Sequence, residues 1–225
     1  HAIPRRQRQM CIRDRNGGSY TITDTATNLS NANFDKAGGS DDAESVTVEI
    51  QGNAENLTAI DLDTTVTNIN LNGKTGVILD MGNIGTRSIT AGGGSYLVRD
   101  AATNLTSIDL TAAPNNNPNA TSVTAVVAGD SEDLTGVDLD SDVGAIDLNG
   151  KSGVLMDAGN AHNRVITKNG GTYTITDTAT NLSNDNFDKA GGSDDAESVT
   201  VEIQGNGENL TAIDLDTTVT NINLN

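Results

Sequence analysis

The segment Leu57–Asn72, LTAIDLDTTVTNINLN, decides how this chain folds. It contains the pattern aliphatic-x-x-aliphatic-x-Leu twice, starting at Leu57 and at Val66. The same pattern starts again at Leu105, Leu134, Val143, Leu210 and Val219, and a degenerate version starts at Leu29. This recurrence indicates a short structural unit that the chain uses many times.

Other short segments alternate between apolar and polar residues, as in Val46, Val48 and Ile50. Alternation places the apolar side chains on one face of a β-strand. Turn-forming segments such as NGK, GNA and AGGG separate the apolar runs, so we expect a strand to start about every 8–11 residues. Few windows show a helical period. The segment DTATNL is predicted to form one helical turn capped by Asp24, or an Asx turn.

Three long repeats organise the chain. The strings GGSYTITDTATNL, GGSYLVRDAATNL and GGTYTITDTATNL surround Tyr20, Tyr96 and Tyr173, at spacings of 76 and 77 residues. We predict repeat 1 over 17–92, repeat 2 over 93–169 and a truncated repeat 3 over 170–225. Repeat 3 stops inside a segment that repeat 1 continues as GKTGVILDMGN, so we expect the chain to be a fragment of a longer protein.

Repeats 1 and 3 differ at only a few positions, and one of these differences is informative. Ala32 of repeat 1 is replaced by Asp185 in repeat 3. A carboxylate is costly in a dry core, so we predict that this position faces solvent.

Two all-β architectures fit these patterns. The favoured one is a β-solenoid, similar to a parallel β-helix and built from repeats of about 76 residues, in which each short strand stacks on the strand one coil earlier. It explains the aliphatic core and the missing linkers between repeats. The alternative is a row of small β-sandwich domains, although sandwich cores use more large aromatic residues.

Residues 1–15 do not belong with the rest. Arg5–Arg15 reads RRQRQMCIRDR and holds five of the thirteen basic residues. It resembles the in-frame translation of a transposon-end adaptor used for short-read sequencing libraries. We therefore interpret 1–15 as a non-native leader and exclude it from the fold. The alternative is a basic arm that binds nucleic acid, which would be unusual on so acidic a chain.

The acidic composition limits the partners. The net charge is -18, which argues against nucleic acid and anionic membrane surfaces, since both are negative. No segment approaches the roughly 18–20 apolar residues of a membrane span. The single cysteine, Cys11, lies in the leader, so the chain has no intrachain disulfide.

Catalytic constellations are nearly absent from the sequence. Beyond the leader there is one histidine, His162, no cysteine, and arginine only at 87, 99 and 164. We expect His162 to be a solvated loop residue and the protein not to be an enzyme. Carboxylates are plentiful, which leaves a glycosidase-like carboxylate pair as the alternative.

Clusters of acidic residues beside glycine are the best candidate sites. Calcium takes six to eight oxygen ligands from carboxylates and turn carbonyls. The segments GGSDDAES, GDSEDL and VDLDSD supply the calcium candidates Asp41, Asp42, Glu44, Asp130, Glu132, Asp133, Asp138, Asp140, Asp142, Asp194, Asp195 and Glu197. Neither the EF-hand loop nor the GGxGxDxUx nonapeptide is present. The alternative role is that of solvated turn carboxylates that keep a sheet edge soluble.

The strings YTITDTATNL and LTSIDL resemble the long tandem repeats of large secreted bacterial surface proteins, including adhesins of the repeats-in-toxin type. This resemblance covers residues 17–225. It implies export to the cell surface or the extracellular space, a stalk or adhesive role, and calcium.

We therefore expect a structural or adhesive module that acts as an extended stalk or a multivalent array. Glycans or other cell-surface components, and neighbouring repeats of the same longer chain, are the expected partners. A β-helix enzyme or spike that acts on polysaccharide is the alternative.

Overall fold

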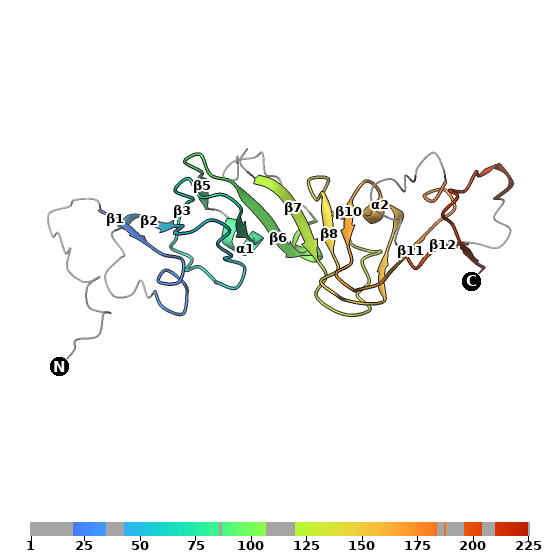
Figure 1. Cartoon of the computed structure of the whole chain (residues 1–225), viewed down its shortest axis with the longest axis horizontal. Coiled ribbons are helices and arrows are strands. Elements are labelled where there is room, and N and C mark those ends of the chain that lie inside the picture. Colours follow the sequence, from blue (N-terminus) through green and yellow to red (C-terminus); the bar gives the residue numbers. More distant parts are fainter. Residues whose placement is uncertain are drawn as a thin grey trace.

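The computed structural model describes residues 20–34, 43–85, 87–106, 120–183, 187, 196–203 and 210–224. It is an elongated β-solenoid, and the chain advances along the long axis from one end to the other (Figure 1). The favoured architecture is thus confirmed. Every strand pair within its three sheets is parallel, because each strand stacks on a strand from a neighbouring coil.

The first sheet has the order β1-β2-β3-β5, the second β10-β8-β7-β6-β4, and the third β13-β12-β11-β9. The strands are β1 (Tyr20–Asp24), β2 (Ala43–Glu49), β3 (Asn68–Asn70), β4 (Val77–Leu79), β5 (Ser88–Thr90), β6 (Tyr96–Ala101), β7 (Ala120–Val126), β8 (Ala145–Asp147), β9 (Val154–Met156), β10 (Val165–Thr167), β11 (Tyr173–Asp177), β12 (Ser198–Glu202) and β13 (Asn221–Asn223). The helical elements are α1 (Met81–Ile84), α2 (Ala158–Ala161) and the 3₁₀ turns η3 (Ala102–Asn104) and η6 (Leu210–Ala212).

Consecutive repeats share their sheets. Strand β4 belongs to repeat 1 by sequence, yet it pairs with β6 of repeat 2. In the same way β9 of repeat 2 pairs with β11 of repeat 3. A row of separate sandwich domains would keep its strands within each repeat. The sharing therefore makes the described coils one continuous stack.

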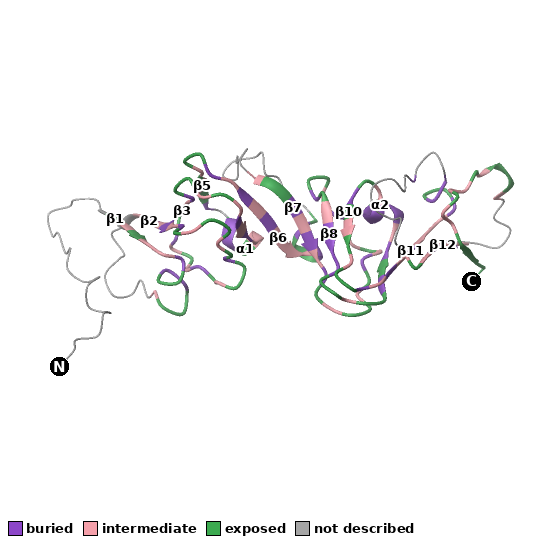
Figure 2. Cartoon of the chain, viewed as in Figure 1, coloured by how far each residue is buried: buried purple, intermediate pink, exposed green. Residues whose placement is uncertain are grey.

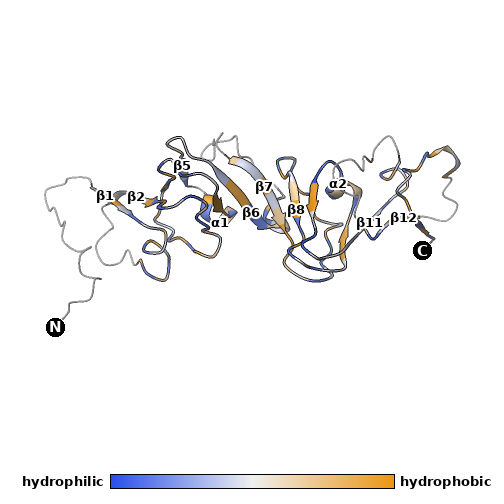
Figure 3. Cartoon of the chain, in the orientation of Figure 1, coloured by the Kyte–Doolittle hydropathy of each residue, from blue (hydrophilic) through white to orange (hydrophobic). Residues whose placement is uncertain are grey.

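One hydrophobic core runs through the stack, from Ala26 to Val201. Inward residues of neighbouring strands lie side by side, as in Val48, Ile69 and Ile89. Strand β6 shows the alternation directly, with Tyr96 and Val98 buried and the residues between them half-buried (Figure 2). The strands of the second sheet carry much of the hydrophobic sequence, whereas the surrounding loops are largely hydrophilic (Figure 3).

The recurring hexapeptide pattern marks inward positions, but not always strands. In the occurrence at Val66, residues Val66, Ile69 and Leu71 are buried and β3 lies between its ends. The occurrence at Leu57 also buries Leu57 and Leu62, yet it forms turns. Here the expectation of a regular strand is wrong. Asn56 Oδ1 accepts a hydrogen bond from Thr58 N at 3.0 Å, and Ile60 N donates to Leu57 O at 2.8 Å. Leu57 N still donates to Ile78 O of β4 at 2.9 Å, so Asn56 and Ile78 form a single bridge instead of a ladder.

Two smaller predictions are confirmed. The DTATNL segment forms one helical turn, in which Leu29 N donates to Thr25 O at 3.1 Å. The side chain that accepts from the N–H group three residues on is Thr25, whose Oγ1 accepts from Asn28 N at 3.4 Å, whereas Asp24 Oδ1 accepts from the adjacent Thr25 N at 2.8 Å. Ala32 is exposed, as the exchange with Asp predicted.

Candidate functional site

The acidic cluster of the GDSEDL turn binds its own backbone. Glu132 Oε2 accepts hydrogen bonds from Ala128 N at 2.7 Å and Gly129 N at 3.0 Å. Asp133 Oδ1 accepts from Thr135 Oγ1 and Thr135 N, at 2.7 and 3.0 Å, and these bonds lower the pKa of Asp133. Asp130 Oδ1 accepts from Ser152 N on the next coil at 2.9 Å. Each carboxylate is thus engaged in holding a turn.

Repeat 1 holds the same turn with less charge. Asn53 and Asn56 stand where repeat 2 has Asp130 and Asp133. Asn53 Oδ1 accepts from Thr75 N at 3.1 Å, and Asn56 Oδ1 accepts from Thr58 N and Oγ1 at 3.0 and 2.9 Å. Because a neutral amide oxygen makes the same bonds, this geometry needs an acceptor but not a negative charge. It favours the turn role for these carboxylates over the calcium role.

The VDLDSD segment is similar. Asp140 Oδ1 accepts from Asp142 N at 2.8 Å, while Asp138 and Asp142 are exposed. In repeat 1, Asp63 Oδ1 accepts from Thr65 N and Oγ1 at 2.8 and 2.6 Å. Within the described part of the chain, no three Asp, Glu, His or Cys side chains are grouped so that they could hold a metal ion.

Most of the remaining calcium candidates lie outside the residues that the structure describes. Asp41, Asp42, Asp194 and Asp195 lie outside the described residues, as does the side chain of Glu44, whose backbone belongs to β2. Glu197 is exposed and forms an ion pair with Lys168 Nζ at 3.2 Å. For GGSDDAES, calcium binding stays a prediction.

A buried arginine clamps each helical turn to the preceding coil. The guanidinium of Arg164 donates to the Gly159 and Asn160 carbonyls of α2, at 2.6 and 3.1 Å. It also donates to the carbonyls of three residues on the coil before it, at 2.9, 3.0 and 3.1 Å: Val143, Leu139 and Asp140. A cation suits this place because the last carbonyls of a helix lack backbone partners.

Repeat 1 builds the same clamp with one bond fewer. Arg87 donates to four carbonyls, two on α1 and two on the coil before it, at 2.6 to 3.1 Å. Its Nε is buried and has no hydrogen-bond partner among the described residues. Burial lowers the pKa of Arg87 and of Arg164, and nearby aspartates, including Asp63 and Asp140, oppose that shift.

Asparagine and aspartate complete the clamp. Asn160, which is 2% exposed, donates to the Leu134 and Val137 carbonyls at 2.8 and 2.6 Å. Asp157 caps α2 by accepting from Asn160 N at 2.7 Å. Burial and the neighbouring Asp177 raise the pKa of Asp157, because both disfavour its charge. The pKa of Asp80, which caps α1, is raised for the same reasons, by burial and by the neighbouring Asp100.

These neighbours join consecutive repeats. Asp100 Oδ2 of repeat 2 accepts from Met81 N of repeat 1 at 2.9 Å. Asp177 Oδ2 of repeat 3 accepts from Ala158 N of repeat 2 at 3.0 Å. Each helical turn is therefore held at both ends, by an arginine of its own repeat and by an aspartate of the next.

Sequence reasoning missed this clamp. A signal for it exists, because DMGNIGTR at 80–87 and DAGNAHNR at 157–164 keep only Asp, Gly, Asn and Arg in common. Of these four residues, the aspartate caps the helical turn, and the asparagine and arginine donate to carbonyls of the preceding coil. His162, one of the variable positions, is half-buried at the end of α2, with its Nε2 2.6 Å from Asn163 Nδ2.

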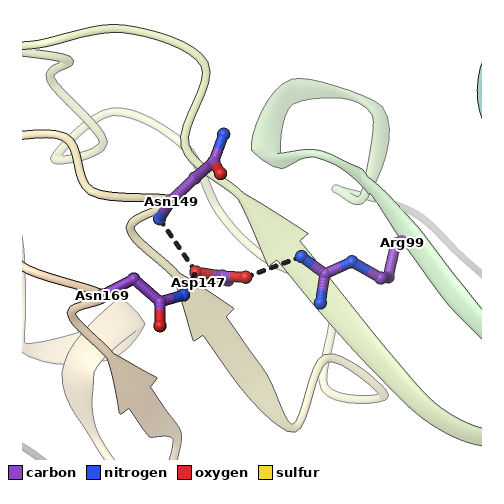
Figure 4. A network of polar contacts seen from close by, with 4 residues as sticks. All are labelled: Arg99, Asp147, Asn149 and Asn169. Atoms are coloured by element: carbon purple, nitrogen blue, oxygen red, sulfur yellow. Dashed lines mark hydrogen bonds and ion pairs between the residues drawn. The ribbon is translucent and has the colours of Figure 1, made fainter.

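One polar network is larger in repeat 2 than in repeat 1, where only the bond from Asn72 N to Asn70 Oδ1, at 2.9 Å, corresponds to it (Figure 4). Arg99 Nη2 of β6 pairs with Asp147 Oδ2 of β8 at 2.6 Å. Asp147 Oδ1 accepts from Asn149 N and Asn169 Nδ2, both at 2.8 Å. Burial would raise the pKa of Asp147, but the hydrogen bonds and Arg99 outweigh it, so this pKa is lowered. A lowered pKa is the opposite of what a general acid requires.

Comparison with known proteins finds no matching family model, no matching curated protein and no matching solved structure. Among the helices that the structure describes, none has the length and apolarity that a membrane crossing needs.

Proposed function

We propose that this chain is a structural or adhesive repeat module of a secreted or cell-surface protein, and that it acts as an extended stalk. The sharing of strands between repeats carries the proposal. Because β4 and β9 each complete the sheet of the next repeat, there is no linker at which the described coils could bend independently. The aspartate contacts to α1 and α2 reinforce both junctions.

A stalk of this kind presents the same surface at a fixed spacing. Repeats 1 and 3 are nearly identical in sequence, so a weak binding surface on one also occurs on the other. Weak contacts at fixed spacing gain avidity when the partner surface is itself multivalent. Glycans and cell-surface components are the partners we propose.

The test of the stalk is its dependence on repeat number. Residues 93–169 would be inserted once or twice more, and the maximum dimension measured by small-angle X-ray scattering. We expect that dimension to grow by an equal step for each insertion, with the cross-section unchanged. A constant dimension, or a cross-section that grows, would contradict the proposal.

Calcium is tested separately. Isothermal titration with Ca²⁺ would be compared for the chain and for a Glu44→Gln and Glu197→Gln double variant, with Asp130→Asn as the matched control. If calcium binds at GGSDDAES, the double variant loses heat of binding and the control keeps it. Equal titrations for all three proteins would remove these residues from the calcium proposal.

A further inference from the structure

Three turns of the described chain have an asparagine followed by a glycine at their centre: Asn72–Gly73, Asn149–Gly150 and Asn169–Gly170. All of these residues have a positive φ, between 50° and 90°. In each turn a hydrogen bond of 2.8 Å joins the residues on either side of the pair. This is the geometry of a type I′ turn, for which Asn-Gly is a preferred dipeptide because both residues tolerate the left-handed region. The arches between strands therefore use a dipeptide that is also chemically reactive.

An asparagine that precedes glycine loses its amide without an enzyme. The backbone nitrogen of the glycine attacks Cγ of the asparagine and forms a cyclic imide. The bond between Cγ and Nδ2 breaks, and this nitrogen leaves as ammonia together with the proton of the glycine N–H group. Water then opens the ring on either side of the new nitrogen bond, which yields aspartate or isoaspartate. Glycine favours the attack because no side chain hinders it and its backbone is flexible.

Two of the three asparagines form a matched pair. Asn72 and Asn149 both lie in the sequence LNGK, so their neighbours along the chain are the same. Both side chains are exposed. Their own N–H groups are held alike, because Asn72 N donates to Asn70 Oδ1 at 2.9 Å and Asn149 N donates to Asp147 Oδ1 at 2.8 Å. A difference in reactivity between them must therefore come from the surrounding structure.

The two turns differ at the attacking nitrogen. In repeat 1, Gly73 N donates a hydrogen bond to Ala91 O of the next coil at 3.2 Å. In repeat 2, Gly150 N has no hydrogen-bond partner among the described residues. An attack by Gly73 N must first break its bond, and an attack by Gly150 N has no such bond to break.

The third asparagine is restrained through its side chain. Asn169 Nδ2, which is the leaving nitrogen, donates to Asp147 Oδ1 at 2.8 Å. The Asn149 amide points away from Asp147 and is bound to no other described residue (Figure 4). Asn149 therefore combines an unrestrained side chain with an unbonded glycine N–H group, and it is the one asparagine of the three that has both.

We infer that Asn149 is a site of spontaneous deamidation, and that it reacts before Asn72 and Asn169. The product adds a negative charge to the turn between β8 and β9, beside Asp147. The isoaspartate form also adds a methylene group to the backbone of that turn. A stalk does not require this modification, so the inference goes beyond the proposed function and stands independently of it.

Peptide mapping by mass spectrometry tests this inference. The full chain would be incubated at mildly alkaline pH, and conversion of each asparagine measured over time, while circular dichroism confirms that the β-fold persists. We expect Asn149 to react about fivefold faster than Asn72, the effect of one ordinary hydrogen bond. Asn169 should also react more slowly than Asn149. Equal rates at Asn72 and Asn149 in the folded chain, or an intact Asn149, would overturn the inference.

The unfolded chain supplies the control. In concentrated urea Asn72 and Asn149 should react at the same rate, because their neighbours along the chain are the same. A difference that persists in urea would overturn the assignment to the unbonded Gly150 N–H group.

A variant provides a second readout. Asn149→Gly removes the reactive amide and keeps a residue that tolerates positive φ. Enzymatic methylation of isoaspartyl groups should fall to the level that Asn72 and the other asparagines supply, and the rate at Asn72 should not change. Unchanged methylation would contradict the assignment to Asn149.

Discussion

The sheets of repeat 1 and repeat 2 have the same inner face and different outer faces. On the inside, Val48 and Ile69 of repeat 1 correspond to Ala125 and Ile146 of repeat 2, and all four are buried. On the outside, one row of repeat 1 is Thr23, Thr47, Asn68 and Ser88, and the matching row of repeat 2 is Arg99, Thr124, Ala145 and Val165.

The difference shows which constraints act on this fold. Inner residues must fill a layer of fixed thickness, so most of them are aliphatic, and Tyr96 and Tyr173 are buried aromatic exceptions. Outer residues meet water or one another, so Ser88 can become Val165, which is 61% exposed. Arg87 and Arg164 are polar, yet they are as constant between the two repeats as the inner apolar residues. The reason is that each guanidinium satisfies several buried carbonyls, which no other side chain could do in the same place. The following predictions test that division.

The largest effect is expected at the clamp. Arg164→Met should lower the free energy of unfolding by about 4 kcal/mol, and Arg87→Met by about 3 kcal/mol, because buried carbonyls lose a charged donor. Arg164 should matter more, since its Nε donates to Val143 O whereas Nε of Arg87 has no partner in the described part of the chain. Urea unfolding at pH 7 measures both. Arg99→Met, on the outer face, is the control, and a loss below about 1 kcal/mol for Arg164→Met would contradict the structural role.

Gly94 lies just before β6 and Gly171 just before β11, and both test how closely the coils are packed. A Cβ on Gly171 would overlap the carbonyl oxygen of Lys151, and a Cβ on Gly94 would overlap that of Lys74. Gly171→Ala should therefore cost about 3 kcal/mol, as expected for overpacking against backbone. Gly144→Ala is the control, because nothing lies within 4 Å of its Cβ and repeat 1 has Thr67 there. Equal melting temperatures for the two variants would show that the coils can separate at little cost.

The capping aspartates predict a rise in stability on mild acidification. The raised pKa of Asp80 and Asp157 means that, between the folded pKa and 3.8, the folded state binds more protons than the unfolded state. The contribution of these two aspartates to stability should increase as pH falls through their raised pKa and stop increasing below 3.8. Asp157→Asn should weaken this dependence, whereas Asp130→Asn should leave it closer to that of the unaltered chain. Urea midpoints measured at several pH values test this prediction. If the midpoint changed with pH equally in both variants, the assignment to Asp157 would be contradicted.

The outer-face ion pair should contribute modestly. A double-mutant cycle with Arg99→Thr and Asp147→Asn converts this site to the residues of repeat 1, Thr23 and Asn70. We expect a coupling free energy of about 1 kcal/mol at pH 7, because the Arg99 side chain is 35% exposed and that of Asp147 12% exposed. The pKa of Asp147 is lowered, so the coupling should disappear only as pH falls below 3.8. A coupling that persists at pH 2 would argue against an ionic contact.

The smallest effect is expected at Tyr96. Within the residues that the structure describes, its hydroxyl is buried without a hydrogen-bond partner, and burial raises the pKa of Tyr96 to about 12. Removing an unsatisfied hydroxyl while keeping the ring should leave stability within about 0.5 kcal/mol or increase it. Thermal unfolding of Tyr96→Phe measures this. A loss above about 1 kcal/mol would show that the hydroxyl has a partner outside the described residues.

Much of the fold could be predicted from local patterns. Alternation at Val46, Val48 and Ile50 and the hexapeptide at Val66 both report a side chain that must point inward, and the structure buries them. The turn at Leu57 has the same hexapeptide and yet forms only a single bridge to β4, between Asn56 and Ile78. The acidic clusters were visible as charge, but their partners were not: Asp130 accepts from the backbone of Ser152, 22 residues away, and Glu197 pairs with the Lys168 side chain, 29 residues away.

The sequence by itself determined the repeat spacing, the all-β class and the inward positions, since each depends on residues that are neighbours along the chain. Only the tertiary structure decided that β4 and β9 leave their own repeat for the next sheet. It also decided that Arg87 and Arg164 are interior residues rather than surface charges. Both outcomes depend on which backbone groups lie on the adjacent coil, about 20 residues away in the chain, and no local pattern encodes that proximity.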